Sequence, residues 1–156
     1  MLLTPETLAA LAGLGLEKYG LITGRSGVEV EWALRMLAPE GEALAVSGMR
    51  GSERHPPFGV IVPADLYAKP DPEALLYALR ALGSRAAVYV GDTSDDLDLA
   101  LRYRAERVAE DASLPRTLAV CVATGETERV YRERGADITL SHISELPAAL
   151  ATLRMR

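Results

Sequence analysis

Three aspartates, Asp92, Asp95 and Asp96, lie close together in the sequence, directly after an apolar run that ends at Gly91. Carboxylates this close repel one another unless a cation or a basic group lies among them. Carboxylate oxygens are also the ligands that Mg²⁺ and other hard cations prefer. The first functional hypothesis is therefore a hard-metal site, with Asp92 and Asp96 as the candidate Mg²⁺ ligands.

The run before these aspartates, residues 86–90, is apolar and contains two valines, which is typical of a parallel strand buried on both faces. A helical pattern follows, and Ser94 or Asp95 is expected to cap it. Asp92 and Asp96 are thus predicted at the carboxyl end of a parallel strand, where open α/β sheets bind their ligands. The alternative for acidic residues at a helix start is a favourable interaction with the helix dipole, without any metal.

The rest of the chain also alternates between short apolar strands and helical patterns. Further strands are predicted at residues 19–23, 58–62, 117–122 and 138–140. This alternation predicts an α/β fold with three αβα layers, in which helices cover both faces of one parallel sheet of four or five strands. A single domain is expected over residues 1–156. Residues 39–57, broken by glycines and prolines, are expected to form a long irregular connection.

Two further features follow strands of this predicted sheet, Thr23-Gly24 and Lys69. Because right-handed crossovers bring the carboxyl ends of parallel strands to one edge, these groups are expected near Asp92 and Asp96. A threonine hydroxyl and free N–H groups at a helix start bind phosphate oxygens, and Lys69, held extended before Pro-x-Pro, offers a positive charge to the same anion. The combination predicts a site for phosphate and Mg²⁺. Without it, Thr23-Gly24 is an ordinary turn and Lys69 a solvated loop residue.

Composition restricts the partners and the compartment. The formal charge is −5 and the pI is near 5.1, which argues against nucleic acid or an anionic membrane as a partner. No apolar run approaches the roughly 18 residues of a membrane span, and the sequence has no signal-peptide pattern. The single cysteine, Cys121, lies in an apolar run, so a buried thiol and a cytoplasmic location are expected.

The order and spacing of three short motifs resemble the haloacid dehalogenase-like (HAD) hydrolases, chiefly phosphatases of the phosphoglycolate phosphatase type. The motifs are Leu21-Ile22-Thr23-Gly24-Arg25, Lys69-Pro70-Asp71-Pro72 and Gly91-Asp92-Thr93-Ser94-Asp95-Asp96. The resemblance implies a HAD-type, Rossmann-like core that hydrolyses phosphate monoesters of small metabolites with Mg²⁺. It implies that Thr23 and Gly24 bind phosphate and that Lys69 neutralises the phosphate and orients the nucleophile. Asp92 would then ligate Mg²⁺, and Asp96 would be a further ligand or a support for one.

The chain departs from this family at the nucleophile. In the family, the nucleophile belongs to an Asp-x-Asp motif at the end of the first, central strand, upstream of the threonine motif. The 22 residues before Thr23 contain no aspartate and no apolar strand before the first helix, and the family's helical cap domain is missing as well. Because an aspartyl phosphate cannot form without that carboxylate, the chain is expected to be inactive as a phosphatase on its own.

Three explanations are compatible with this departure: a truncated or split product of a longer hydrolase, a non-catalytic module that binds phosphate, metal or protein, or catalysis by other residues. In the family, the missing strand lies between the strands predicted here at 19–23 and 86–90. Its loss predicts either direct pairing of these two strands or a gap with two unpaired edges. A gap would favour a homodimer or the donation of a strand by a partner chain.

Overall fold

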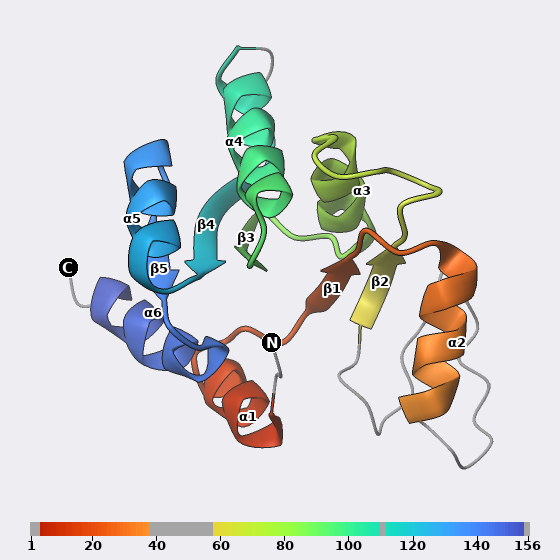
Figure 1. The fold of residues 1–156 in the computed structure, drawn as a ribbon, viewed down its shortest axis with the longest axis horizontal. Coiled ribbons are helices and arrows are strands. Elements are labelled where there is room, and N and C mark those ends of the chain that lie inside the picture. Colours follow the sequence, from red (N-terminus) through yellow and green to blue (C-terminus); the bar gives the residue numbers. More distant parts are fainter. Residues whose placement is uncertain (1–3, 38–57, 110–111, 155–156) are drawn as a thin grey trace.

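The computed structural model describes residues 4–37, 58–109 and 112–154. Within these ranges the chain is an α/β protein in which short strands alternate with helices (Figure 1). The strands are β1 (Tyr19–Ile22), β2 (Phe58–Val62), β3 (Ala86–Gly91), β4 (Arg116–Val122) and β5 (Ile138–Leu140). The helices are α1 (Pro5–Gly13), α2 (Gly27–Leu37), α3 (Glu73–Ala81), α4 (Ser94–Ala109), α5 (Gly125–Arg134) and α6 (Leu146–Arg154), and a 3₁₀ turn, η1 (Ile143–Glu145), precedes α6. The connection expected over residues 39–57 lies outside the described residues.

The five strands form two small parallel sheets. β1 pairs with β2 in the first sheet, and β3, β4 and β5 pair in that order in the second. The α/β class and the parallel pairing are therefore confirmed, and they are consistent with a Rossmann-like class. The expectation of one continuous sheet is wrong, because no hydrogen-bonded ladder joins β1 to β3 in the described part of the chain. Of the two arrangements expected for these strands, the described residues have the gap rather than direct pairing (Figure 1).

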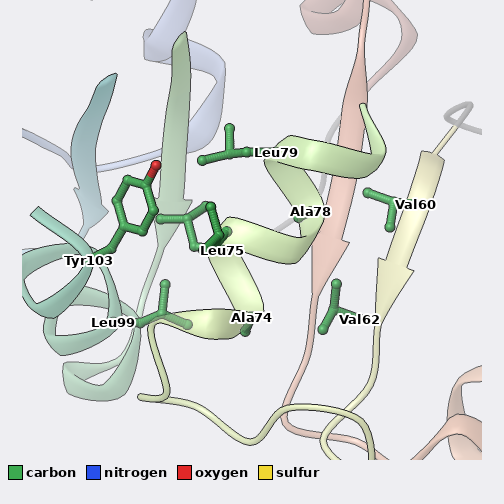
Figure 2. Close-up of a cluster of buried hydrophobic side chains, with 9 residues drawn as sticks. Val60, Val62, Ala74, Leu75, Ala78, Leu79, Leu99 and Tyr103 are labelled. Carbon is green, nitrogen blue, oxygen red and sulfur yellow. The ribbon is translucent and has the colours of Figure 1, made fainter. Parts of the chain in front are cut away.

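Helix α3 connects the two sheets by side-chain packing. It lies against β1 and β2 on one side and against α4 on the other (Figure 2). Leu75 of α3 belongs to a buried cluster that also contains Val62 of β2 and Tyr103 of α4. Ile22 of β1 and Tyr89 of β3 pack against the same cluster. The hydrophobic core is therefore continuous across the two sheets, although the backbone hydrogen bonding is not.

The other face of the strands is covered by α1 and α6, which pack against each other. Leu11 of α1 and Leu146 of α6 share a second buried cluster with Val120 of β4. A third cluster lies between β4 and helices α4 and α5, and it contains Cys121, which is only 2% exposed. The predicted buried thiol is thus confirmed. Burial raises the pKa of this thiol to about 11, so it stays protonated at neutral pH.

Helix α2 lies at one end of the molecule (Figure 1). It begins with a capping box, in which the Ser26 backbone N–H donates to Glu29 Oε2 at 2.8 Å and the Glu29 N–H donates to Ser26 Oγ at 3.4 Å. Val28, Trp32 and Met36 recur at helical spacing on its exposed face, with Trp32 67% exposed. Neither α2 nor any other described helix has the length and apolar character needed to cross a membrane.

Candidate functional site

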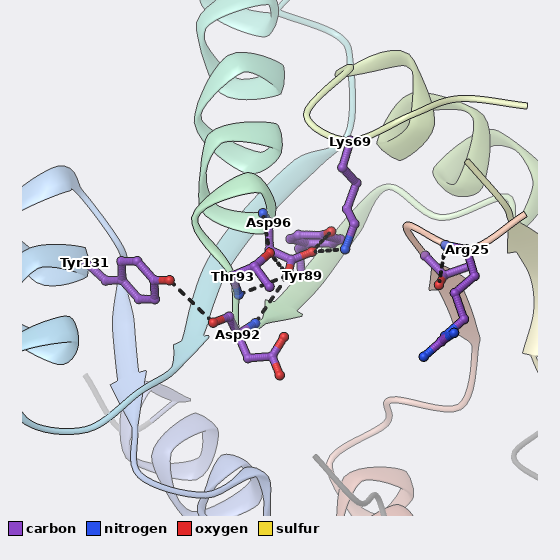
Figure 3. A network of polar contacts seen from close by, with 8 residues as sticks. Arg25, Lys69, Tyr89, Asp92, Thr93, Asp96 and Tyr131 are labelled. Atoms are coloured by element: carbon purple, nitrogen blue, oxygen red, sulfur yellow. Dashed lines mark hydrogen bonds and ion pairs between the residues drawn. The ribbon is translucent and has the colours of Figure 1, made fainter. Parts of the chain in front are cut away.

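The carboxylate of Asp96 is the centre of the polar network at the end of β3 (Figure 3). The residue is only 5% exposed. Its Oδ1 accepts hydrogen bonds from Lys69 Nζ and from the Tyr89 hydroxyl, each at 2.8 Å. Its Oδ2 accepts from the Thr93 hydroxyl at 2.7 Å and from the backbone N–H groups of Thr93 and Asp92 at 3.2 and 3.3 Å. Both carboxylate oxygens are thus fully engaged within the protein.

The local sequence explains why Asp96 lies here. Thr93 precedes the first residue of α4, and its Oγ1 accepts a hydrogen bond from the Asp96 backbone N–H at 3.3 Å. Together with the bond from the Thr93 N–H to the Asp96 carboxylate, this is a reciprocal capping box. The expectation that Ser94 or Asp95 caps the helix is therefore wrong, because the reciprocal pair needs a hydroxyl three residues before the carboxylate.

Gly91 makes room for this arrangement. A Cβ atom at this position would lie 2.1 Å from the Cβ of Asp96, a distance that no side chain can tolerate. The strand end and the first turn of α4 can approach this closely only because residue 91 has no side chain. The glycine at the end of the apolar run, directly before Asp92, therefore has a steric reason that is independent of any metal.

Electrostatics keeps Asp96 ionised. Burial on its own would raise the pKa of this carboxyl, but hydrogen bonds from Lys69, Thr93 and Tyr89 together with the lysine charge outweigh it, and the net shift of the pKa is downward. Burial raises the pKa of the Tyr89 phenol strongly, and the adjacent Asp96 carboxylate raises it further. Tyr89 therefore remains a protonated hydrogen-bond donor at any physiological pH.

Lys69 reaches Asp96 from the segment that follows β2. Its ammonium forms an ion pair with Asp96 at 2.8 Å, and its side chain is 15% exposed. The predicted meeting of Lys69 with the aspartates after β3 is thus found in the structure. Since Lys69 belongs to the side of the molecule that carries β2 and Asp96 to the side that carries β3, this ion pair also links the two sheets at their carboxyl ends.

Asp92 presents its carboxylate to solvent next to this ion pair. Its backbone is fixed on both sides, because its N–H donates to Asp96 and its carbonyl accepts from the Tyr131 hydroxyl at 3.4 Å. The side chain is exposed and makes no hydrogen bond or ion pair with another described residue. Its oxygens are therefore available to a ligand from outside the chain.

Thr23 and Gly24 follow β1 and lie apart from this network. The Thr23 N–H donates to the Val62 carbonyl at 3.0 Å, and Thr23 Oγ1 accepts from the Arg25 N–H at 3.2 Å. Within residues 4–37, 58–109 and 112–154, no hydrogen bond or ion pair joins Thr23 to Lys69. Figure 3 shows Arg25 on the far side of Lys69 from Asp92. The structure thus joins Lys69, Asp92 and Asp96 and leaves the threonine turn separate.

Whether the site fits Mg²⁺ depends on the carboxylate oxygens that accept no hydrogen bond within the protein. In the described part of the chain, no three His, Cys, Asp or Glu side chains come together as a metal-binding group. Both carboxylate oxygens of Asp96 already accept hydrogen bonds. Of the two roles predicted for Asp96, the hydrogen bonds therefore favour support of a metal ligand over direct ligation of Mg²⁺. Asp92 fits, because Mg²⁺ is commonly held by one or two carboxylates and completes its shell with phosphate oxygens and water.

Two members of the network, Tyr89 and Thr93, were not identified from the sequence. Tyr89 interrupts an otherwise aliphatic strand, and a buried tyrosine needs a hydrogen-bond partner for its hydroxyl. This pattern in the sequence could have indicated its role. Thr93 and Asp96 match the capping-box spacing, which was also readable. Both were missed because the aspartates were interpreted as ligands rather than as hydrogen-bond acceptors.

Comparison with protein-family models, with curated proteins and with solved structures finds no match.

Proposed function

We propose that this chain is the phosphate- and Mg²⁺-binding part of a HAD-like phosphohydrolase core and is inactive as a phosphatase on its own. The observation that carries the proposal is the ion pair between Lys69 and Asp96, with the exposed Asp92 carboxylate beside it. A lysine anchored by a buried carboxylate next to an open one is a suitable arrangement for a phosphate with a bound divalent cation. We include in this proposal that the fold is one three-layer αβα domain of HAD type that lacks its first central strand.

Each residue has a distinct role in this proposal. Asp92 would hold Mg²⁺, and Lys69 would lie against the phosphate with its ammonium fixed by Asp96. When bound, Mg²⁺ would neutralise charge on the phosphate oxygens. Thr23 and Gly24 would bind a phosphate oxygen through the hydroxyl and the backbone N–H of their turn. Residues 4–26 contain no aspartate, so the segments that adjoin β1 in the sequence offer no aspartate for in-line attack at the end of this strand.

A non-catalytic binding or assembly module is the second candidate, and the two unpaired strand edges favour it. β1 and β3 each pair on one side only within the described residues. Unpaired edges are sites at which other chains add strands. This candidate uses the same fold and does not require the site to bind phosphate.

Hydrolysis of p-nitrophenyl phosphate with Mg²⁺ tests the first part of the proposal. The 156-residue chain is expected to give no turnover above background. Turnover that is abolished by Asp92→Asn would contradict the claim that the chain is inactive alone. Asp95→Asn is the matched control, because Asp95 is also exposed and lies in the first turn of α4.

Binding of inorganic phosphate tests the second part. Isothermal titration is expected to show phosphate binding that requires Mg²⁺ and that is lost in Asp92→Asn but retained in Asp95→Asn. Absence of Mg²⁺-dependent phosphate binding in the folded wild-type chain would refute the proposed site and leave the assembly module as the better candidate.

A further inference from the structure

The junction between β1 and β3, which we call the β1–β3 junction, contains two strand edges that have no strand partner among the described residues. Within the described residues β1 is bonded only to β2, and β3 only to β4. Figure 1 shows β1 and β3 as the neighbouring edges of the two sheets. Each edge carries backbone N–H and C=O groups that a further strand would satisfy.

The side chains at this junction are less buried than their apolar character leads one to expect. Val88, Tyr89 and Val90 of β3 are only partly buried, as are Leu21 and Ile22 of β1. A strand that is apolar on both faces is typical of the interior of a parallel sheet. Both strands therefore have the composition of interior strands and the position of edge strands.

Helices already cover both faces of the junction. On one face, Ile22 of β1 and Tyr89 of β3 pack against the cluster that contains α3. On the other face, Tyr19 of β1 and Val88 and Val90 of β3 pack against the cluster of α1 and α6. The two edges thus share a helical layer on each side, which is the environment that an interior strand needs.

The two sheets are also held in place relative to each other. Lys69 and Asp96 form their ion pair at the carboxyl ends, and α3 packs against both β1 and α4. In Figure 2, β1 and β3 run in the same direction on either side of α3. One added strand can therefore run parallel to both edges at once, as every strand pair in the described sheets is parallel.

We propose that the β1–β3 junction binds one extended apolar segment of another polypeptide, which pairs with both strands and joins the two sheets into one. The lengths of β1 and β3, four and six residues, set the length of the paired segment. Because helices cover both faces, its side chains are apolar at successive positions. A different polypeptide is the donor, since every described strand of a second copy is already bonded within its own sheet. The proposal does not depend on phosphate binding.

The probe is a fluorescein-labelled synthetic peptide, Lys-Lys-Val-Val-Ile-Val-Val-Lys-Lys. Its control is the same peptide with proline in place of the isoleucine, which has the same charge but lacks the central N–H. Fluorescence anisotropy with the full chain is expected to show saturable binding of the first peptide and at least tenfold weaker binding of the proline peptide. Equal binding of the two peptides, or no binding of the first, would overturn the proposal.

Hydrogen exchange locates the bound peptide. Amides of residues 19–22 and 86–90 are expected to become protected together, whereas those of β5, at the other edge of its sheet, are unchanged. Protection at β5 instead would overturn the proposal. So would a dimer of the chain alone, seen by light scattering, in which the amides of β1 and β3 are already protected, because a second copy would then be the occupant.

A variant pair tests the apolar character of the junction. Val88→Asn places a polar side chain on the partly buried edge strand and is expected to weaken peptide binding at least tenfold. Val108→Asn, at a position of α4 that is 79% exposed, is expected to leave binding unchanged. Equal affinity of the Val88→Asn variant and the wild type, with circular dichroism showing both folded, would overturn the proposal. If Val88→Asn does not fold, the proline peptide still decides the question.

Discussion

Asp96 is the common acceptor of the hydrogen bonds that Lys69, Tyr89 and Thr93 donate from their side chains at the end of β3. Its carboxylate accepts five hydrogen bonds, from three side chains and two backbone N–H groups. This many donors offset the desolvation cost of a buried charge. The loss of one charged partner leaves that cost uncompensated and destabilises the fold. The residue therefore has a structural task that is complete without any metal, and Asp92 is left as the carboxylate that faces solvent.

Lys69→Met is expected to destabilise the fold by about 3–5 kcal/mol, because it leaves the buried Asp96 carboxylate without its counter-ion. Urea unfolding followed by circular dichroism measures the change. Asp96→Asn combined with Lys69→Met is expected to be more stable than Lys69→Met alone, since the unpaired charge is then removed. Arg129→Met is the control, because among the described residues Arg129 pairs with exposed glutamates of α5, and its loss should cost less than about 1 kcal/mol. Equal costs for the two single variants would contradict the role given to Lys69.

Gly91→Ala is expected to destabilise the protein by at least about 1–3 kcal/mol, the usual cost of overpacking, because the new methyl group would overlap Asp96. Thermal unfolding measures the change. Gly13→Ala is the matched control, since no atom lies within 4 Å of a Cβ at that position in α1. A Gly91→Ala variant as stable as the wild type would show that the strand end and α4 are not held in close contact.

At the scale of the elements, the sequence predicts most of what is observed. The apolar runs and helical periodicities place all the described strands, because these patterns follow directly from which faces are buried. The N-cap of α4 is predicted wrongly, since Ser94, Asp95 and Thr93 all have the chemistry of a cap and only the hydrogen-bond partner decides among them. Tyr89 and Thr93 show the same limit for the site, because whether a side chain supports a carboxylate depends on contacts between elements.

Thr93→Ala is expected to cost about 1–2 kcal/mol, because it removes the hydroxyl that both accepts from the Asp96 N–H and donates to the Asp96 carboxylate. Thr124→Ala offers a matched control at the start of α5. Thr124 is also the N-cap of its helix, but its side chain makes no capping hydrogen bond, so only a few tenths of a kcal/mol are expected. Chemical unfolding of both variants measures the difference. The same loss in both would mean that the Thr93 hydroxyl has no special role.

At the scale of the whole molecule, the sequence predicts the parallel α/β class but does not decide how the strands pair. Strand pairing depends on which edges meet after the helices have packed, and an apolar run is the same in one sheet as in two. The sequence therefore left direct pairing and a gap as alternatives for the strands now seen as β1 and β3. β1 and β3 have the composition of interior strands, although each pairs on one side only within the part of the chain that the structure describes.

The link between the two sheets is expected to weaken in acid. The pKa of Asp96 is lowered in the folded protein, so its contribution to stability is complete above the unfolded value of about 3.9 and is lost as the pH falls through the lowered folded value. The difference in unfolding free energy between the wild type and Asp96→Asn is therefore expected to be constant from about pH 7 to 5 and to shrink below about pH 4. Urea unfolding at a series of pH values measures it. A difference that stays constant to about pH 2.5 would show that protonation of Asp96 does not control the link between the sheets.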